Sequence, residues 1–156
     1  KEDFEQITQE LRENGFIKTK NKVLRKKTQS RISPLVYDVE GFTFTVGKNN
    51  VQNDYVTFKV AKNSDLWFHT QKIHSSHLII ANPNQSEIPF SVIKTAAEIT
   101  AYFSQGMSGS KITVDYCLKK FVKKPTGGKI GFVTYTDYKT IIVDPRQHIE
   151  FLITQQ

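Results

Sequence analysis

Residues 47–80 bring together several kinds of side chain that could take part in chemistry. The stretch holds three of the four histidines and the only tryptophan of the 156-residue chain, together with several Asn, Gln and Asp residues. A buried polar group without a partner costs about 1–3 kcal/mol, so a core segment of this length is normally mostly apolar. The crowding of polar side chains therefore predicts a functional site.

Three histidines in this stretch suggest a metal site as one hypothesis. His69, His74 and His77 follow the pattern H-x4-H-x2-H, and neutral imidazole is a common metal ligand. The stretch has no cysteine to complete a zinc set and no H-E-x-x-H motif. We predict no metal and assign His69 and His77 to a site without one. The alternative is that His69 bonds to a strand end while His74 faces solvent.

Catalytic arrangements fit the sequence less well than binding. Asp54 and Asp65 could form a carboxylate pair, but no nucleophile accompanies them. Cys117 lies in V-D-Y-C-L, which is typical of a buried strand, and a Cys–His pair would need a distant histidine. The G-G-K at 127–129 lacks the spacing of a Walker loop. We therefore predict a protein that is not an enzyme and uses no cofactor.

A binding surface explains the four side-chain amides of residues 49–53 better than a catalytic site does. Asn tolerates turn geometry, so any one of them could simply form a turn, but four amides within five positions exceed the need of one turn. Exposed amides beside lysine, tryptophan and histidine provide the hydrogen bonds, charge and stacking surfaces with which proteins read unpaired RNA. For Trp67 a core position is the alternative. The residues concerned are Lys48, Asn49, Asn50, Gln52, Asn53, Trp67 and His69.

A second basic cluster lies further along the chain, at Lys119, Lys120, Lys123 and Lys124. If this segment is extended, alternation places lysines on both faces of the strand. Two interpretations stay open: an edge strand on which lysines prevent unwanted pairing, or a track that contacts phosphates. Residues 15–36 also contain no acid and form either a solvated linker or a phosphate-contacting arm.

Short helices and strands must position these side chains. Apolar residues recur at helical spacing in residues 3–14 and in the main predicted helix, residues 89–104, whereas residues 49–61 are ambiguous but allow a helical turn. Predicted strands cover 34–39 and 42–46, a hairpin around Glu40-Gly41, and then 66–69, 77–80, 111–122, 130–135 and 140–143. The predicted class is α+β: a single compact domain with a mainly antiparallel β-sheet, one main helix and a short N-terminal helix.

Bulk properties narrow the class of partner. The formal charge of +7 and the pI of about 9.4 favour a polyanion such as nucleic acid, an anionic membrane or an acidic glycan. A single cysteine excludes an internal disulfide framework and suits a reducing compartment. No apolar run reaches the roughly 20 residues of a membrane span, so no membrane insertion is expected. The chain begins at Lys1, which favours an excised domain.

Several rare motifs occur in an order that resembles a known family. G-K-N-N-x-Q-N-D, then D-x-W-F-H-T and S-H-x-I-I, look like the NFACT RNA-binding domain of RqcH/NEMF-type ribosome quality-control factors, which are often called fibronectin-binding proteins in bacteria. The tokens V-D-Y, K-K-P, G-F-V and K-T-I follow in the family's order. The resemblance covers roughly residues 34–144. It implies an NFACT domain in residues 34–156, preceded in residues 1–33 by the end of a coiled-coil helix and a basic linker.

The resemblance implies an RNA-binding module that contacts tRNA, the rRNA of the large ribosomal subunit, or both. Family members bind that subunit after a stalled ribosome has split and recruit tRNA for template-independent C-terminal tailing of the nascent chain. The implied location is cytoplasmic and ribosome-associated. The implied RNA-contacting residues are Lys48, Asn49, Asn50, Asn53 and Asp54 in the first motif and Asp65, Trp67, His69, Ser76 and His77 in the second. On their charge alone, the lysines 119, 120, 123 and 124 join these as predicted RNA-contacting residues.

One departure from the family pattern concerns the loop before Ser76. The family usually has Pro-Gly where this chain has His74-Ser75, so an altered turn is expected. The family's older bacterial name leaves a rival function, an adhesin that binds host fibronectin or fibrinogen after non-classical display at the cell surface. The lone cysteine and the lack of a visible signal peptide argue against export.

Overall fold

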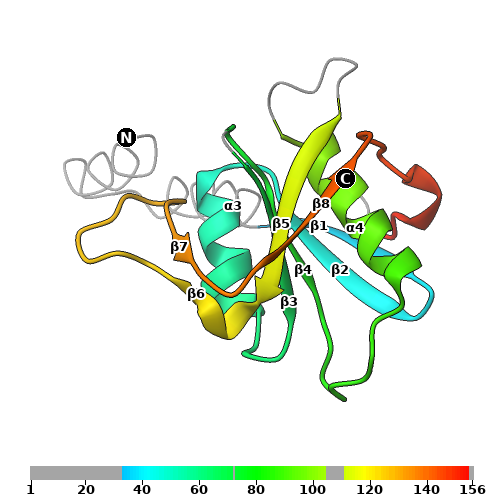
Figure 1. Cartoon of the computed structure of the whole chain (residues 1–156), viewed down its shortest axis with the longest axis horizontal. Coiled ribbons are helices and arrows are strands. Elements are labelled where there is room, and N and C mark those ends of the chain that lie inside the picture. Colours follow the sequence, from blue (N-terminus) through cyan, green and yellow to red (C-terminus); the bar gives the residue numbers. More distant parts are fainter. Residues whose placement is uncertain (1–32, 72, 105–110, 155–156) are drawn as a thin grey trace, which may run out of the picture. The chain divides into compact units, whose positions relative to one another are not determined.

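The computed structural model describes residues 33–71, 73–104 and 111–154. Residues 34–156 form one compact unit, and the fold given below is that of this unit. Its centre is a six-stranded antiparallel sheet with the strand order β1-β2-β4-β3-β5-β8, and helical layers lie on both faces of the sheet (Figure 1). The predicted α+β class with a mainly antiparallel sheet is confirmed.

The elements follow the chain in a regular order. The strands of the main sheet are β1 (Leu35–Val39), β2 (Phe42–Gly47), β3 (Leu66–Thr70), β4 (His77–Ile80), β5 (Ile112–Leu118) and β8 (Lys139–Val143). A smaller sheet pairs β6 (Val122–Lys123) with β7 (Thr134–Tyr135). The helical elements are α3 (Asn50–Tyr55), a π-helical turn (Val56–Val60), α4 (Phe90–Tyr102) and 3-10 turns at Lys119–Phe121 and Ile149–Phe151.

Strands β1 and β2 form the predicted hairpin. Val39 pairs with Phe42, and the two loop residues, Glu40 and Gly41, have φ angles of 52° and 88°. Two consecutive positive φ angles are those of a type I′ turn, whose twist matches that of the paired strands. The hairpin places β2 beside β4, second from the edge of the sheet, and β2 ends at Gly47 against α3.

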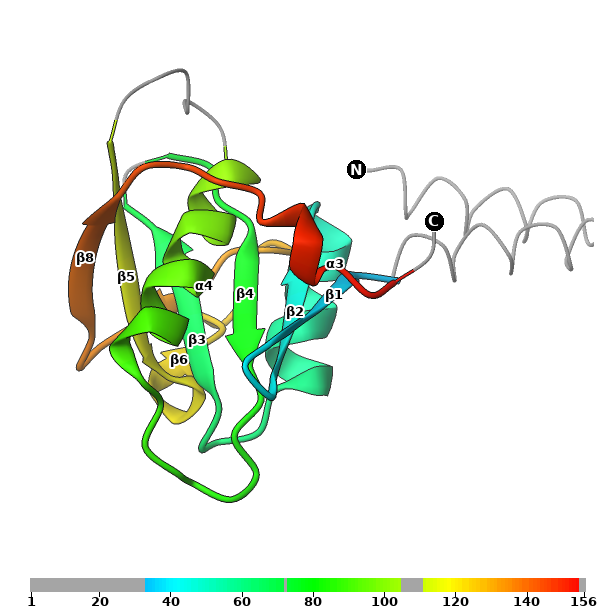
Figure 2. The same ribbon diagram turned by 90° about the vertical axis from the view of Figure 1, so that its right-hand side faces the viewer.

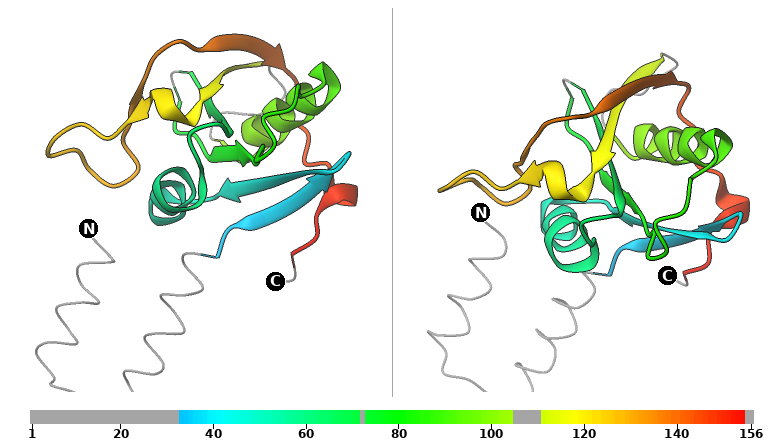
Figure 3. Two further views of the ribbon diagram at one scale, coloured as in Figure 1. Left: turned by 90° about the horizontal axis from the view of Figure 1, so that it is seen from below. Right: turned by 60° about the horizontal axis from the view of Figure 1, so that its bottom comes forward.

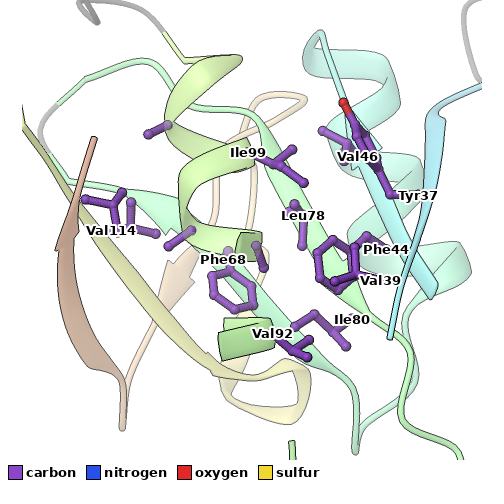
Figure 4. Close-up of a cluster of buried hydrophobic side chains, with 14 of the residues drawn as sticks. Tyr37, Val39, Phe44, Val46, Phe68, Leu78, Ile80, Val92, Ile99 and Val114 are labelled. Atoms are coloured by element: carbon purple, nitrogen blue, oxygen red, sulfur yellow. The ribbon is translucent and has the colours of Figure 1, made fainter. Parts of the chain in front are cut away.

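Helix α4 covers one face of the sheet (Figure 2). It begins after Pro89, close to the predicted start, and ends at Tyr102. Val92, Ala96 and Ile99 recur at spacings of four and three, so they lie on one side of the helix and are fully buried against the sheet. Figure 4 shows this first core, in which strand residues such as Phe68 and Leu78 point toward the helix. The prediction of one main helix is confirmed.

The opposite face of the sheet carries a second core. Alternation along β3 sends Phe68 toward α4 and Trp67 to the other side, where Trp67 packs with Ile79 and Cys117. Val56 of the π-helical turn and Val122 of β6 close this second core. Helix α3 and the β6–β7 pair therefore cover the face that α4 leaves open (Figure 3). Most of the candidate site residues lie on or beside this face.

Strand β5 is shorter than predicted. It ends at Leu118 rather than Val122, because the backbone N–H of Lys119 donates to the carbonyl of Asp65 and that of Lys120 to the carbonyl of Asn63. These two hydrogen bonds draw residues 119–121 into a 3-10 turn. The expectation of lysines alternating along an extended strand was therefore wrong.

The strand predicted at 130–135 is also shortened, to Thr134–Tyr135. Gly131 has a φ of +87°, and the backbone N–H of Phe132 donates to the carbonyl of Lys129 in a turn. The predicted helix at 3–14 and the basic segment at 15–36, apart from residues 33–36, lie outside the described residues. In the part of the chain that is described, no helix is long and apolar enough to cross a membrane.

Candidate nucleic-acid interface

Asn53 ties helix α3 to the start of β4. Its Nδ2 donates to the carbonyl of Ser75 at 3.1 Å, and its Oδ1 accepts from the backbone N–H of His77 at 3.0 Å. The side chain is buried. Gly47 makes the close approach possible, since a Cβ there would lie 2.6 Å from Oδ1 of Asn53. Asn53 thus satisfies two buried backbone groups in the loop that carries the second motif.

A buried hydroxyl joins the tryptophan and one histidine of the two motifs. Trp67 Nε1, which can only donate, bonds to Thr57 Oγ1 at 3.0 Å, and Thr57 Oγ1 lies 2.8 Å from Nδ1 of His77. Among the described residues no other side-chain bond is made by this hydroxyl, so Thr57 donates to Nδ1 and the His77 proton sits on Nε2. Thr57 was not predicted; its position between the apolar residues Val56 and Phe58 was its only signal in the sequence.

His69 belongs to an aromatic cluster, which we define as Trp67, His69, His77 and Tyr135. The rings of Trp67 and His69 stack with centroids 5.4 Å apart, and His77 meets both at 5.2 Å. Burial lowers the pKa of His69, and burial followed by the nearby His69 lowers the pKa of His77 well below the ordinary value. Both imidazoles are therefore neutral at pH 7, and they supply flat, uncharged packing surfaces.

We expect acid to destabilise the domain through these two histidines. Their folded pKa values lie below the ordinary 6.5, so below pH 6.5 the unfolded chain binds more protons than the folded one. The unfolding free energy should fall by up to about 1.4 kcal/mol per pH unit for each histidine. Urea denaturation between pH 7.5 and 5 measures this slope. Replacing exposed His74, a lesser cause of both lowered pKa values, with Gln is the matched control and should leave most of the slope; a flat profile of the parent would contradict the assignment.

Asp115 organises the neighbouring part of the same sheet face and was not predicted as a site residue. Its buried carboxylate accepts from Gln71 Nε2 at 2.8 Å, from the hydroxyl of Tyr135 at 2.7 Å and from that of Thr140 at 2.8 Å. Burial and the bond to Asp115 raise the pKa of Tyr135, so its phenol stays a neutral donor. A lone acid within the apolar strand β5 was the available signal.

Two further residues of the second motif are buried and bonded to backbone groups. Asp65 accepts from the backbone N–H groups of Lys62 and Asn82 at 2.9 and 2.8 Å. The hydroxyl of Ser76 donates to the carbonyl of Phe103 at 2.9 Å. Both side chains hold loops in place, and like those of Asn53, Trp67 and His77 they are almost completely removed from the surface.

The loop that departs from the family pattern is closed by a side chain. Ser75 is buried, accepts from the backbone N–H of Thr70 at 2.9 Å and donates to the carbonyl of Ser76 at 2.7 Å. Neither His74 nor Ser75 has a positive φ, so the backbone does not require glycine there. His74 is exposed. The Ser75 hydroxyl thus stabilises the turn that Pro-Gly was expected to supply.

The exposed part of the first motif consists of Lys48, Asn49 and Asn50. Asn49 caps α3 by accepting from the backbone N–H of Gln52 at 2.9 Å, while Oε1 of buried Gln52 accepts from the backbone N–H of Lys48 at 2.9 Å. These two bonds fix the loop and hold the side chains of Lys48 and Asn50 at the surface.

Asp54 fastens a distant loop to α3. One carboxylate oxygen lies 2.8 Å from Nζ of Lys124, and the other accepts from the backbone N–H of Gly131 at 2.8 Å. A Cβ at position 131 would lie 2.6 Å from Oδ1 of Asn50, so only glycine allows this approach. Asp54 and Asp65 thus bind different partners, and the two carboxylates make separate structural contacts rather than a pair.

The ion pair between Asp54 and Lys124 holds the second basic cluster beside α3. Nζ of Lys119 and Nζ of Lys124 lie 5.5 and 5.6 Å from the ring centre of Phe58, and Lys120 lies over Phe121. Lys120 and Lys123 are exposed, as is Lys129 further along the loop. We define residues 119–129 as the lysine segment, and the candidate interface as this segment together with Lys48, Asn49 and Asn50.

The chemistry of this face is that of binding rather than catalysis. Burial raises the pKa of Cys117 to about 12, so its thiol is protonated at neutral pH and is a poor nucleophile. Within residues 33–71, 73–104 and 111–154 there is no group of three or more His, Cys, Asp or Glu side chains that could hold a metal ion.

Comparison with known proteins identifies the family. The model of the "NFACT protein RNA binding domain" matches residues 35–133. The chain belongs to this family. It is 41% identical over 145 residues to the "Rqc2 homolog RqcH" of Streptococcus pneumoniae serotype 2, covering 92% of this chain and 26% of the relative. Over 146 residues it is 40% identical to the "Rqc2 homolog RqcH" of Bacillus subtilis, covering 92% of this chain and 25% of the relative.

A solved structure has the same fold as this NFACT domain. It is the C-terminal part of the fibronectin/fibrinogen-binding protein from Streptococcus suis, with a TM-score of 0.72 and 40% identity, and the match covers 78% of this chain and 49% of that one. The predicted family is thus confirmed. The chain spans about a quarter of the length of the curated relatives it matches.

Proposed function

We propose that this NFACT domain binds RNA through the candidate interface. The observation that carries the proposal is the lysine segment held against the exposed amides of α3 by Asp54 and Gly131. Residues 116–136 contain five lysines and no acid. Among the described residues only one of the five, Lys124, is paired with a carboxylate. The remaining lysines can each displace a counterion from a phosphate.

The predicted site residues divide into two roles under this proposal. Residues with exposed side chains contact RNA, together with the half-buried Lys119: Lys48, Asn49, Asn50, Lys120 and Lys123. Trp67, His77 and the buried polar residues hold the surface in shape instead, because a side chain without exposed area cannot touch a ligand unless the fold opens. His69 and Tyr135 of the aromatic cluster are half-buried and pack on Trp67. The second group contains Asn53, Asp65, Trp67, Ser76 and His77. Lys124 and Asp54 connect the two groups through their ion pair.

Salt dependence of tRNA binding tests the proposal. With five lysines, at positions 48, 119, 120, 123 and 129, neutralising phosphates, a plot of log K against log salt concentration should have a slope of roughly −3.5 to −4.5. Fluorescence anisotropy with labelled tRNA between 50 and 300 mM salt measures it. A slope near zero, or no binding at 50 mM salt, would mean that the lysines do not contact phosphates.

At the level of the whole factor, we propose that the domain contacts tRNA or large-subunit rRNA in the cytoplasm. The "Rqc2 homolog RqcH" relatives support a place in ribosome quality control, where the parent protein would recruit tRNA for tailing of stalled nascent chains. Peptide-bond formation would belong to the ribosome, so no catalytic residue is assigned to this domain. Co-sedimentation of the full-length parent with large ribosomal subunits carrying peptidyl-tRNA tests this placement; recovery only in the ribosome-free fraction would contradict it.

A second candidate function is binding of fibronectin or fibrinogen at the cell surface. The observation that favours it is the name of the solved relative from Streptococcus suis, which shares this fold. Surface plasmon resonance with immobilised fibronectin, in the presence and absence of excess tRNA, separates the two functions. Binding that tRNA displaces would place both ligands on the candidate interface, whereas binding unaffected by tRNA would assign fibronectin to another surface.

A further inference from the structure

An exposed apolar tip lies within a basic, acid-free stretch of the described residues. Ile130 and Phe132 have exposed fractions of 40% and 61%, and they flank Gly131 in the loop that Asp54 holds. A phenylalanine with this exposure gains little from burial, so packing within the domain does not account for it. Nothing in the sequence analysis assigned a role to either residue.

The position of the tip is fixed by bonds on both sides of Phe132. On one side, Gly131 donates to Asp54 and packs so closely on Asn50 that no Cβ fits. The backbone N–H of Phe132 itself donates to the carbonyl of Lys129 at 3.0 Å. On the other side, Val133 packs against the second core. The fold therefore holds this ring in an outward orientation before a ligand binds. Little conformational entropy of the loop is then lost on binding.

The surroundings of the tip select the class of ligand. The five lysines of residues 116–136 have no acidic neighbour in sequence, which favours a polyanion over an apolar protein surface. A polyanion that can also cover an aromatic ring is one that presents flat apolar faces. Unpaired nucleotides do so, whereas a duplex hides its base faces in the stack.

We propose that Phe132 is a stacking platform for an unpaired base of the bound RNA, beside lysines that neutralise the adjoining phosphates. This inference rests on the proposed RNA-binding function and adds to it a preference for single-stranded over duplex segments. Ile130 supports the edge of the same base. The two residues act as a pair, since Phe132 provides the π-face and Ile130 extends the apolar surface.

The test compares four proteins with a single-stranded RNA oligonucleotide and a duplex of the same sequence. Phe132→Ala should weaken single-strand binding about 5- to 150-fold, the range for one base–aromatic stack, and change duplex binding less than about twofold. Phe132→Tyr keeps the ring and should bind like the parent. Phe132→Leu keeps an apolar side chain without a π-face and should behave like Phe132→Ala. All variants should keep the parent's unfolding midpoint, because the ring is exposed.

A spectroscopic readout accompanies the binding data. Phe132→Trp places an exposed indole at the tip while the native Trp67 is buried, so single-stranded RNA should quench the added fluorescence and duplex should not. If Phe132→Ala binds RNA as tightly as the parent while Lys120→Ala/Lys123→Ala/Lys129→Ala binds it more weakly, the stacking proposal alone is overturned. The tip is then a protein contact. Retained binding by Phe132→Leu overturns it in favour of a simple apolar contact. Failure of the parent to bind any RNA overturns the proposed function as well.

Discussion

Replacing Trp67 with Ala should remove most of the stability of the domain. The indole is fully buried, packs with Ile79 and Cys117, and donates to Thr57. Truncating a buried tryptophan typically costs about 3–5 kcal/mol, and here Thr57 Oγ1 also loses the hydrogen bond that it accepts from Nε1. A small domain has only about 5–15 kcal/mol in total, so the variant should unfold at a much lower urea concentration. Far-UV circular dichroism follows the transition without relying on the tryptophan itself.

The matched control is Trp67→Phe. It keeps most of the ring volume and loses only the bond from Nε1, so the expected loss is about 1–2 kcal/mol and the variant should stay folded. RNA affinity of this folded variant should equal that of the parent, because Trp67 has no exposed surface. A folded Trp67→Phe protein with strongly reduced RNA affinity would show that the tryptophan is a ligand platform after all.

Removing three exposed lysines from the lysine segment should have the largest effect on binding. In Lys120→Ala/Lys123→Ala/Lys129→Ala, three counterion-releasing contacts are lost. The slope of log K against log salt concentration should become shallower by about 2 to 3. At 0.15 M salt each contact contributes a factor of about 5, so tRNA affinity should fall roughly 100-fold. Fluorescence anisotropy across a salt series measures both quantities.

A charge-matched control separates this effect from net charge. Lys94, Lys139 and Arg146 are exposed, and they lie on the α4 side: Lys94 on the helix, Lys139 opposite Tyr116 of the first core, and Arg146 bonded through its backbone to Glu98. Replacing these three with Ala removes the same charge and should change affinity less than about threefold. Equal losses for the two triple variants would mean that net charge, not a defined surface, attracts RNA.

The local elements could be read from the sequence because their signals are local. The β1–β2 hairpin has a turn at Glu40-Gly41 with positive φ at both residues, and α4 has apolar residues at helical spacing. The ends of strands were predicted less well where contacts with distant parts of the chain determine the end of the strand. No local pattern indicates that the carbonyls of Asn63 and Asp65 accept hydrogen bonds from the backbone N–H groups of residues 119–120.

The motifs mark where the candidate site residues lie along the chain, but the burial of these residues was not predictable. Asn53 and His77 are polar, and their motif suggested exposed contacts, yet each is satisfied by partners more than 15 residues away in the chain. Asp115 was missed because its three donors come from Gln71, Tyr135 and Thr140, which are brought together only by the pairing of β3, β5 and β8. Burial and satisfaction of polar groups are properties of the assembled fold.

The exposure of the apolar tip was likewise not predictable from the sequence. The G-F-V token at 131–133 resembles the interior of a strand, and a strand was predicted there. Only the contact of Gly131 with Asp54 and Asn50 turns the chain so that Phe132 faces solvent. A residue that a pattern assigns to the core is thereby placed on the surface that we propose to bind RNA.

The central claim is that RNA contacts the candidate interface and not the α4 side of the domain. Titration of the isotopically labelled chain with tRNA, followed by amide chemical shifts, maps the contact residue by residue. We expect the largest shifts in Lys48–Asn50 and in residues 119–132, with the exposed α4 residue Lys94 unchanged. Shifts centred on α4 and β8, with residues 48–50 and 119–132 unaffected, would contradict the account.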